Sequence, residues 1–253
     1  MISIPMPPKT TSDPKPSLAR AFDAPDVKRR YNSRMFGTIA PRYDLITRLL
    51  SFGGDQRWKT RAIEMAQIGP GQRVLDLACG TGDLAIAAAA KGATVVGLDL
   101  TMPMIDLARR RPAPASGRAP AWLVGDMHAL PMPSESFDVV TTGYGLRNVP
   151  DLRVALAEIH RVLRPGGVVC SLDFNKPEAA WLRAVYLTYL DAVGGTLGWV
   201  LHRDPDTYRY IPASIRRYPG ARGVVELLGR TGFRDARYVP LLGGLMAIHL
   251  ARR

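Results

Sequence analysis

Short apolar runs alternate with stretches of helical spacing through residues 72–175 of the chain. The runs predict buried strands at residues 73–77, 94–99, 121–125, 137–142 and 168–173. After Asp151, apolar residues recur at helical spacing, and Pro165-Gly166-Gly167 ends that helix and turns the chain toward the next strand. Strands that alternate with helices predict a parallel sheet with right-handed crossovers.

Both ends of the chain depart from this rhythm. Strands are expected at residues 236–240 and 245–251, and the short turn at Gly243-Gly244 between them makes the pair antiparallel. An insertion at about residues 177–217 precedes them, and residues 27–71 form a helical region that Gly53-Gly54 divides in two. Residues 1–26, rich in proline and polar side chains, are expected to form a disordered tail.

A glycine turn follows the first predicted strand, in VLDLACGTGD (residues 74–83), and the next strand, TVVGLD, ends on Asp99. This is the pattern of a Rossmann-like nucleotide-binding βαβ unit. Gly80 and Gly82 let the backbone approach a ligand closely, and Asp99 can accept hydrogen bonds from ribose hydroxyls. We therefore predict an α/β fold whose sheet occupies residues 72–253.

Charge decides which nucleotide is expected, because GTGDLA also fits the dinucleotide fingerprint G-x-G-x-x-A. A diphosphate binds well at a helix N-terminus, yet Asp76 lies just before this loop and Asp83 lies inside it. Two carboxylates repel a diphosphate but attract the ammonium and sulfonium groups of S-adenosylmethionine, which is the predicted cofactor. Asp126, after the third strand, is placed to accept from the adenine amino group. A dinucleotide and a purely structural loop remain the alternatives.

Bulk composition narrows the class of protein. The chain has 253 residues, enough for one large domain, and 47% of them are apolar. Uninterrupted apolar stretches stay below the roughly 18–20 residues of a membrane span, and the first residues lack a signal-peptide pattern. Cys79 and Cys170 are expected to be reduced thiols in a cytoplasmic protein. The His, Cys and acidic residues show no metal-ligand spacing.

The formal net charge of +12 allows an acidic partner, either nucleic acid or an anionic membrane surface. It also fits an arginine-rich solvated surface. The basic residues are spread along the chain rather than gathered in one tract, which argues against a nucleic-acid-binding arm. Nucleic acid is therefore not an expected partner.

The chain resembles the menaquinone/ubiquinone-biosynthesis C-methyltransferases, which are class I S-adenosylmethionine-dependent methyltransferases of the demethylmenaquinone methyltransferase type. The blocks APRYD, SFG, GLRNV and YRY-P-SI carry the resemblance most specifically, whereas VLDLACGTGDLA and RVLRPGG are shared by many methyltransferases. These blocks occur in the family's order and extend from about residue 35 to GGLMAIH near the end. The resemblance implies a seven-stranded, mostly parallel sheet with an antiparallel terminal strand, an N-terminal helical lid and a helical insertion.

The resemblance also implies methyl transfer to a ring carbon of a prenylated quinol. Thr81, Asp99, Asp126 and Met127 match the family's cofactor contacts, and Gly143 stands where a serine contact often occurs. LDFNKP and YGLRN depart from the commoner LEFSKP and FGLRN. Demethylmenaquinol is the first choice of substrate, a methoxybenzoquinol of the ubiquinone pathway the second, and a phylloquinone-type precursor the third.

Quinol methylation needs a group that stabilises the phenolate of the ring. Arg147 in GLRN follows the fourth strand, at the edge where open α/β sheets bind ligands. We expect Arg147 to stabilise the phenolate. The alternative is an arginine that ties the loop to Asp151. Arginine is a poor proton acceptor, so His128 is the candidate base. Tyr43, Tyr208 and Tyr210 either orient the ring or only pack helices.

The insertion contains WLRAVYLTYLDAVGGTLGWVL (residues 181–201), an apolar and aromatic run that Gly194-Gly195 should weaken as a helix. It is either core or a lid that receives the prenyl tail while arginines rest on anionic headgroups, which implies peripheral membrane contact. An RNA methyltransferase would need an RNA-binding element, which the sequence does not show. A cofactor-binding protein without catalysis would not retain Arg147 and the tyrosines. Homo-oligomerisation stays open.

Overall fold

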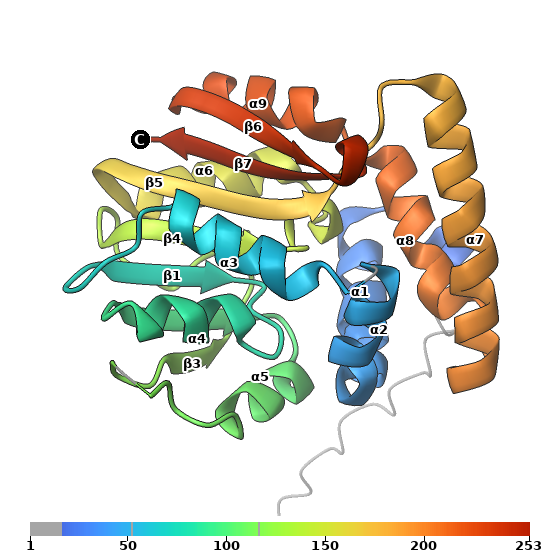
Figure 1. The fold of residues 1–253 in the computed structure, drawn as a ribbon, viewed down its shortest axis with the longest axis horizontal. Coiled ribbons are helices and arrows are strands. Elements are labelled where there is room, and N and C mark those ends of the chain that lie inside the picture. Colours follow the sequence, from blue (N-terminus) through green and yellow to red (C-terminus); the bar gives the residue numbers. More distant parts are fainter. Residues whose placement is uncertain (1–16, 52, 116) are drawn as a thin grey trace, which may run out of the picture.

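A central sheet organises the computed structural model, which describes residues 17–51, 53–115 and 117–253 (Figure 1). Within these residues the sheet has seven strands in the order β3-β2-β1-β4-β5-β7-β6. Strands β1 to β5 pair in parallel, and β7 runs antiparallel to both β5 and β6. The predicted α/β fold is confirmed. The strands are β1 Arg73–Leu77, β2 Thr94–Asp99, β3 Ala121–Val124, β4 Phe137–Gly143, β5 Leu163–Phe174, β6 Arg234–Leu241 and β7 Met246–Arg252.

Strand β5 begins earlier than the sequence predicts. Leu163 already pairs with Phe137, and Val168 pairs with Val139, so the residues between Leu163 and Val168 form a bulge. Gly166 allows the backbone to form this bulge, because its φ of 79° is a conformation that glycine adopts more readily than other residues. The Pro-Gly-Gly segment is thus an irregular part of the strand, where the sequence pattern indicated a turn before it.

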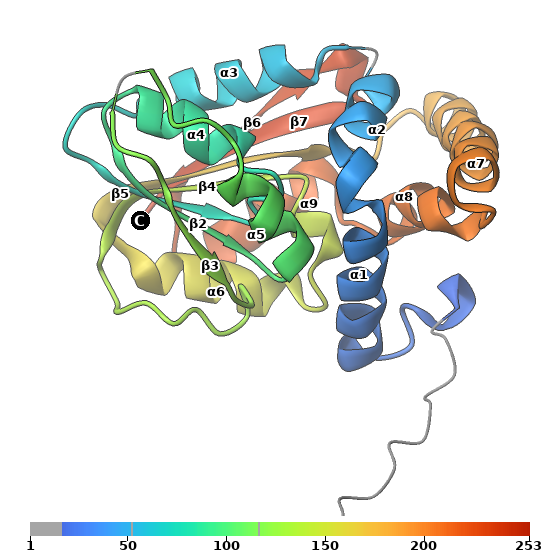
Figure 2. The ribbon, with the colours of Figure 1, turned by 90° about the horizontal axis from the view of Figure 1, so that it is seen from below.

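Helices cover both faces of the sheet. On one face α3 (Asp55–Met65) and α4 (Asp83–Ala90) pack on the strands, and on the other α6 (Leu152–Val162) and α9 (Gly220–Arg230) do so (Figure 2). Helix α5 (Met102–Arg109) lies beside β3. The alanine-rich α4 buries Leu84, Ala85, Ala88 and Ala89, whose small side chains bring the helix close to β1 and β2.

A second group of helices stands beyond the carboxyl ends of the strands (Figure 1). It consists of α1 (Pro25–Ile39), α2 (Tyr43–Leu50), α7 (Ala180–His202) and α8 (Asp206–Arg217). The predicted break at Gly53-Gly54 separates α2 from α3, and a further short turn at Ala40–Arg42 separates α1 from α2.

The ordered chain begins before residue 27, the start expected from the sequence. Residues 1–16 of the predicted tail lie outside the described residues, but Leu18–Arg20 forms a 3-10 turn and α1 starts at Pro25. Phe22 stacks on Tyr210 with ring centroids 5.6 Å apart. This partner lies far along the sequence, so local composition could not indicate it.

Helix α7 runs unbroken through the glycines that were expected to weaken it. Gly194, Gly195 and Gly198 are buried against α8 and the turn before it. A Cβ atom on Gly198 would lie 2.5 Å from the carbonyl oxygen of Asp204, and one on Gly194 would lie 3.1 Å from that of Tyr208. The absence of side chains therefore lets the two helices approach closely, and this packing outweighs the low helix propensity of glycine.

Candidate active site

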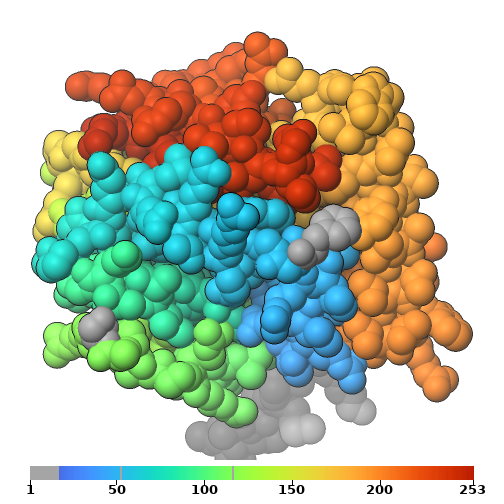
Figure 3. Space-filling view, in the orientation of Figure 1, coloured from blue at the N-terminus to red at the C-terminus, as the bar shows by residue number. Residues whose placement is uncertain are grey.

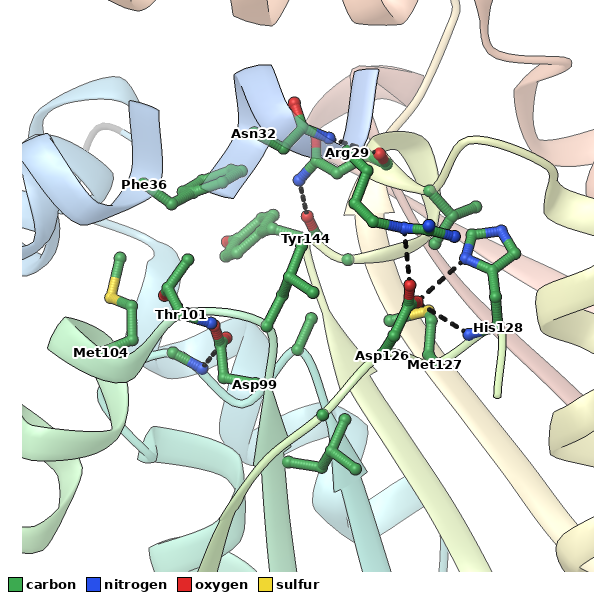
Figure 4. Close-up of a pocket in the computed structure, with 18 of the residues that line it drawn as sticks. Arg29, Asn32, Phe36, Asp99, Thr101, Met104, Asp126, Met127, His128 and Tyr144 are labelled. Atoms are coloured by element: carbon green, nitrogen blue, oxygen red, sulfur yellow. Dashed lines mark hydrogen bonds and ion pairs between the residues drawn. The ribbon is translucent and has the colours of Figure 1, made fainter. Parts of the chain in front are cut away.

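A cavity opens where the parallel strands β1 to β4 end, under the side chains of α1 (Figure 4). The turn after β1 forms one wall, with φ of 53° at Gly80 and 90° at Gly82. Gly80 lines the cavity, whereas Gly82 begins α4, and a Cβ atom on it would lie 2.4 Å from the Trp122 ring.

Two residues other than glycine also have positive φ at this edge of the sheet. Ala78 after β1 has φ of 50°, and Tyr144 after β4 has φ of 60°. Both line the cavity. Strained backbone of this kind persists where surrounding structure fixes it, and it concentrates at functional sites.

Asp99 holds the glycine turn in place from the end of β2. One carboxylate oxygen accepts from the backbone N–H of Gly80 at 2.9 Å, and the other accepts from the N–H and hydroxyl of Thr101. Burial raises the pKa of Asp99, while these hydrogen bonds oppose the rise. Each oxygen can accept further hydrogen bonds, so Asp99 can also receive ribose hydroxyls, as predicted.

Asp76 offers an unused acceptor to a ligand. Its side chain is 1% exposed, and Oδ1 accepts from the hydroxyl of Thr141 at 2.8 Å. By distance and angle Oδ2 has no hydrogen-bond partner among the described residues, although the backbone N–H of Ala85 lies near enough to lower the pKa of the carboxyl. Burial outweighs this effect and raises the pKa of Asp76 to about 7. Asp76 lines a small pocket that shares Gly80 and Gly143 with the main cavity. A buried oxygen without a donor fits the ammonium group of S-adenosylmethionine.

Asp83 does not contribute the charge that the sequence argument gave it. Its carboxylate pairs with Lys59 at 2.8 Å and with Arg111 at 3.0 Å. Burial by itself would raise the pKa of Asp83, but these cations hold it below its ordinary value. Because Lys59 and Arg111 balance the charge of Asp83, the carboxylate of this motif that makes no ion pair among the described residues is Asp76.

Asp126 and His128 form a fixed pair at the far side of the cavity (Figure 4). Asp126 accepts from the backbone N–H of His128 at 2.9 Å and contacts its Nδ1 at 3.0 Å, and it pairs with Arg29 of α1 at 2.7 Å. The Nε2 atom of His128 lies 2.9 Å from the carbonyl oxygen of Asp151. Both ring nitrogens are engaged, so this structure does not support His128 as the base. Met127 is buried in the same wall.

A second, apolar pocket lies between α1, α2 and α8. Aliphatic side chains supply much of its lining, with Tyr208, Tyr210 and Arg147 as polar members. Phe36, Tyr43 and Tyr144 line both this pocket and the cofactor cavity. These three aromatic residues therefore form a wall that the two cavities share.

Arg147 is the cation of the apolar pocket. It is 7% exposed, and its Nη1 donates to Asp173 at 2.6 Å and to the carbonyl of Tyr144 at 3.0 Å. Its Nε has no partner among the described residues. Burial opposes its charge, but Asp173 raises the pKa of Arg147, which therefore stays cationic. The tie to Asp151 considered from the sequence is replaced by Asp173, at the end of β5.

Three tyrosines predicted from the sequence line this pocket. Burial raises the pKa of Tyr43 and of Tyr208 to about 12, so both are neutral hydrogen-bond donors at neutral pH. The hydroxyl of Tyr208 contacts Nε2 of His202 at 2.9 Å. Tyr210 stacks on Tyr31, and within the described residues its hydroxyl makes no hydrogen bond by distance and angle. Burial raises the pKa of Tyr210, and the nearby Asn32 side chain opposes the rise.

The profile of the ubiE/COQ5 methyltransferase family matches residues 25–253. A demethylmenaquinone methyltransferase of Thermus thermophilus is 43% identical over 221 residues, which cover 87% of this chain and 100% of that protein. The chain belongs to the ubiE/COQ5 methyltransferase family. A ubiquinone/menaquinone biosynthesis C-methyltransferase of Rubrivivax gelatinosus is 37% identical over 247 residues, which cover 96% of each chain.

Solved structures agree with this methyltransferase fold. An S-adenosylmethionine-dependent methyltransferase of Thermotoga maritima superposes with a TM-score of 0.64 at 18% identity, covering 87% of this chain and 98% of that chain. One from Aquifex aeolicus gives 0.59 at 16% identity and covers 85% and 97% of the two chains. At this identity the likeness concerns the fold.

Sequence reasoning missed the network that supports the shared wall of the methyltransferase. Asp55, 2% exposed, accepts from Lys59 at 2.6 Å and from the hydroxyl of Tyr144 at 2.7 Å. The i, i+4 spacing of Asp55 and Lys59 was a visible signal. Tyr144 directly follows β4, at the same carboxyl edge of the sheet where Asp99 ends β2. Asn32, which donates to the carbonyl of Asn148 at 2.6 Å, gave no such signal.

Proposed function

We propose that this methyltransferase transfers a methyl group to a ring carbon of a prenylated quinol in the cytoplasm. Demethylmenaquinol is the first choice, because the T. thermophilus relative is named for that activity. A methoxybenzoquinol of the ubiquinone pathway is the alternative, since other relatives are named for both quinones. The observation that carries the proposal is the aromatic wall shared by the cofactor cavity and a second pocket that holds the buried cation Arg147.

S-adenosylmethionine is the cofactor that the family and the cavity fit. Asp76 would hold its ammonium group through the free Oδ2, and Asp99 would accept from its ribose. Met127 and Asp126 would lie on the adenine side, and Gly143 would leave space near Leu84. When bound, the cofactor supplies an electrophilic methyl group on a sulfonium sulfur.

The chain's own task is to present a nucleophilic ring carbon to that methyl group. Transfer of the proton from a neighbouring hydroxyl to solvent water raises the electron density of the carbon, because phenolate charge delocalises over the ring. After the carbon takes the methyl group, its own hydrogen leaves as a proton to water and the ring becomes aromatic again. Arg147 lowers the free energy of the phenolate by charge, and its free Nε can donate a hydrogen bond. Phe36, Tyr43 and Tyr144 hold the ring against the cofactor cavity, which contributes by proximity and orientation.

The test is methyl transfer from labelled S-adenosylmethionine to reduced demethylmenaquinone and to reduced demethylated methoxybenzoquinone, side by side in detergent. Label only in the first ring supports menaquinone biosynthesis. Label in both shows an enzyme of both pathways, and label only in the second selects the alternative. If neither ring is labelled while calorimetry shows cofactor binding, the proposed substrate class is wrong.

A further inference from the structure

The outer face of α7 is an apolar surface that no other described part of the chain covers. Trp181, Val185, Trp199 and Val200 are 72%, 62%, 66% and 61% exposed. Ala184, Thr188, Ala192 and Thr196 are also exposed, and together these residues follow helical spacing along one side of the helix. We call this set the α7 face. It is uncharged and has a tryptophan near each end.

The opposite side of α7 is fixed to the protein. Gly194, Gly195 and Gly198 pack against α8, and Leu190 is 1% exposed in the core. Among the described helices α7 alone has the length and composition to cross a membrane, yet a third of its most apolar window is buried. A helix that is apolar on all sides is ordinarily buried on all sides. The exposed α7 face therefore needs a partner, and the helix can lie along a bilayer rather than across it.

Cations lie at the carboxyl-terminal end of the α7 face (Figure 3 shows this helix in orange along one side of the molecule). Arg42 of the lid donates to the carbonyl of Leu201 at 2.9 Å, and Arg203 follows the helix. Neither guanidinium pairs with a carboxylate in the described part of the chain, although Asp204 and Asp206 lie nearby. With a net charge of +12, this end fits an anionic surface.

The same end adjoins the apolar pocket. Thr207 and Tyr208, which line that pocket, follow α7 after a short turn, and Tyr208 contacts His202 at the end of the helix. A prenylated quinol is held in a bilayer by its tail. A substrate pocket beside a helix that lies at the bilayer surface can receive such a molecule without its passage through water.

We infer that the α7 face docks onto an anionic lipid bilayer, with Trp181 and Trp199 at the headgroup level and Arg42 and Arg203 against anionic lipids. Tryptophan favours this interfacial region, and an apolar face flanked by cations binds there. The inference rests on the proposed function for the identity of the substrate. The binding surface itself is argued from exposure and charge.

The experiment is co-flotation of the purified full chain with vesicles of phosphatidylglycerol and phosphatidylcholine, or of phosphatidylcholine alone, at low and high salt. The Trp181→Ser/Trp199→Ser variant removes both anchors, and Leu242→Ser, at an exposed leucine (45%) elsewhere on the surface, is the matched control. We expect binding to anionic vesicles at low salt, at least about a tenfold weaker partition for the double variant and no change for the control. Tryptophan fluorescence should shift to the blue on vesicle binding in the wild type and the control, but not in the double variant.

Absence of flotation at low salt, or equal binding by the double variant, overturns the inference. Concentration-dependent dimers that the double variant abolishes, without flotation, assign the face to a second copy instead. Turnover of a short-tailed quinol in detergent tests the proposed function separately from bilayer docking. A double variant that turns over normally but no longer floats supports docking, whereas a wild type inactive on every quinol refutes the substrate class alone.

Discussion

The cofactor cavity and the apolar pocket share a wall but are built in different ways. The cavity is formed by the loops that follow β1, β2, β3 and β4, and some of its polar groups bind one another: Asp99 holds Gly80, and Asp126 holds His128. The pocket is formed by α1, α2 and α8, whose residues lie far apart in the sequence. Its one fixed charge pair, Arg147 and Asp173, joins the ends of two strands.

This difference predicts which binding step a substitution in each site should weaken. The cavity depends on the sheet, so changes there should act on cofactor affinity with the pocket intact. The pocket depends on helix packing, and changes there should act on the quinol while cofactor binding persists. The predictions below test that separation, beginning with the largest expected effect.

Substitution of Arg147 should give the largest effect on turnover. We expect Arg147→Gln to lower kcat by about 100-fold or more, as for loss of one preorganised charge-stabilising group. Cofactor affinity should stay within about twofold, because the guanidinium lines the pocket rather than the cavity. Single-turnover methyl transfer and calorimetry measure the two quantities.

Folding must be controlled in that experiment, because Asp173 is 0% exposed and would be left without its cation. Breaking a buried pair costs about 3–5 kcal/mol. Arg147→Gln/Asp173→Asn restores a neutral hydrogen-bonded pair and should be folded but inactive, and Arg147→Lys should recover part of kcat. Normal turnover by the double variant would remove the guanidinium from the reaction.

Asp76→Asn should act on the cofactor instead. We expect cofactor affinity to fall about 10- to 100-fold at pH 8, because a hydrogen bond to a charged partner contributes roughly 1.5–3 kcal/mol. In the wild type the pKa of Asp76 is about 7, and an ammonium ligand requires the carboxylate to be deprotonated. Binding should therefore weaken about tenfold from pH 8 to pH 6 in the wild type. Calorimetry should show no such dependence in the variant.

The stability of the cofactor-free protein should change with pH in the opposite direction to cofactor affinity. The unfolded Asp76 has a pKa of about 3.9, so between pH ~4 and ~7 the folded state holds a proton that the unfolded state has lost. The free energy of unfolding should fall as pH rises through this window. Thermal melts of Asp76→Asn without cofactor should lack this contribution. A melting temperature equally pH-dependent in both proteins would contradict the raised pKa.

Gly198→Ala tests the pocket through its packing. A Cβ atom there would lie 2.5 Å from the Asp204 carbonyl, so α7 and α8 must separate. Overpacking typically costs about 1–3 kcal/mol, and we expect a lower Tm and a several-fold higher KM for the quinol. Gly229→Ala, a helix position in α9 with open space, is the control and should be neutral or stabilising. Weakened cofactor binding in Gly198→Ala would contradict the separation of the two sites.

The same contrast explains what the sequence could predict. Asp76, Asp99 and Gly80 were found because strand ends and a glycine turn are local signals that place side chains at one edge. Asp83 was misjudged because its counter-charges, Lys59 of α3 and Arg111 after α5, come from other parts of the sequence. A charge argument from a motif alone omits the partners that folding brings to it.

The pocket was predictable only in part. Tyr43, Tyr208 and Tyr210 were candidates, but their pattern fits packing as well as function, and only the tertiary arrangement places all three around one cavity. The partner of Arg147 was sought at Asp151, nearby in sequence, and is Asp173, across the β4–β5 pair. Contacts between distant segments leave no periodic trace in a single sequence.

Arg29→Ala should give the smallest effect and tests whether α1 helps to close the cavity. Its ion pair with Asp126 is 2.7 Å long, but the side chains are 44% and 25% exposed. Such pairs contribute roughly 0.2–1 kcal/mol, so we expect KM for the cofactor to rise about two- to fivefold at low salt and less at high salt. Arg30→Ala breaks the neighbouring pair with Asp26, whose side chains are both 60% exposed, and should leave KM unchanged. Equal effects of the two variants would show that the net charge of α1 matters and the contact with Asp126 does not.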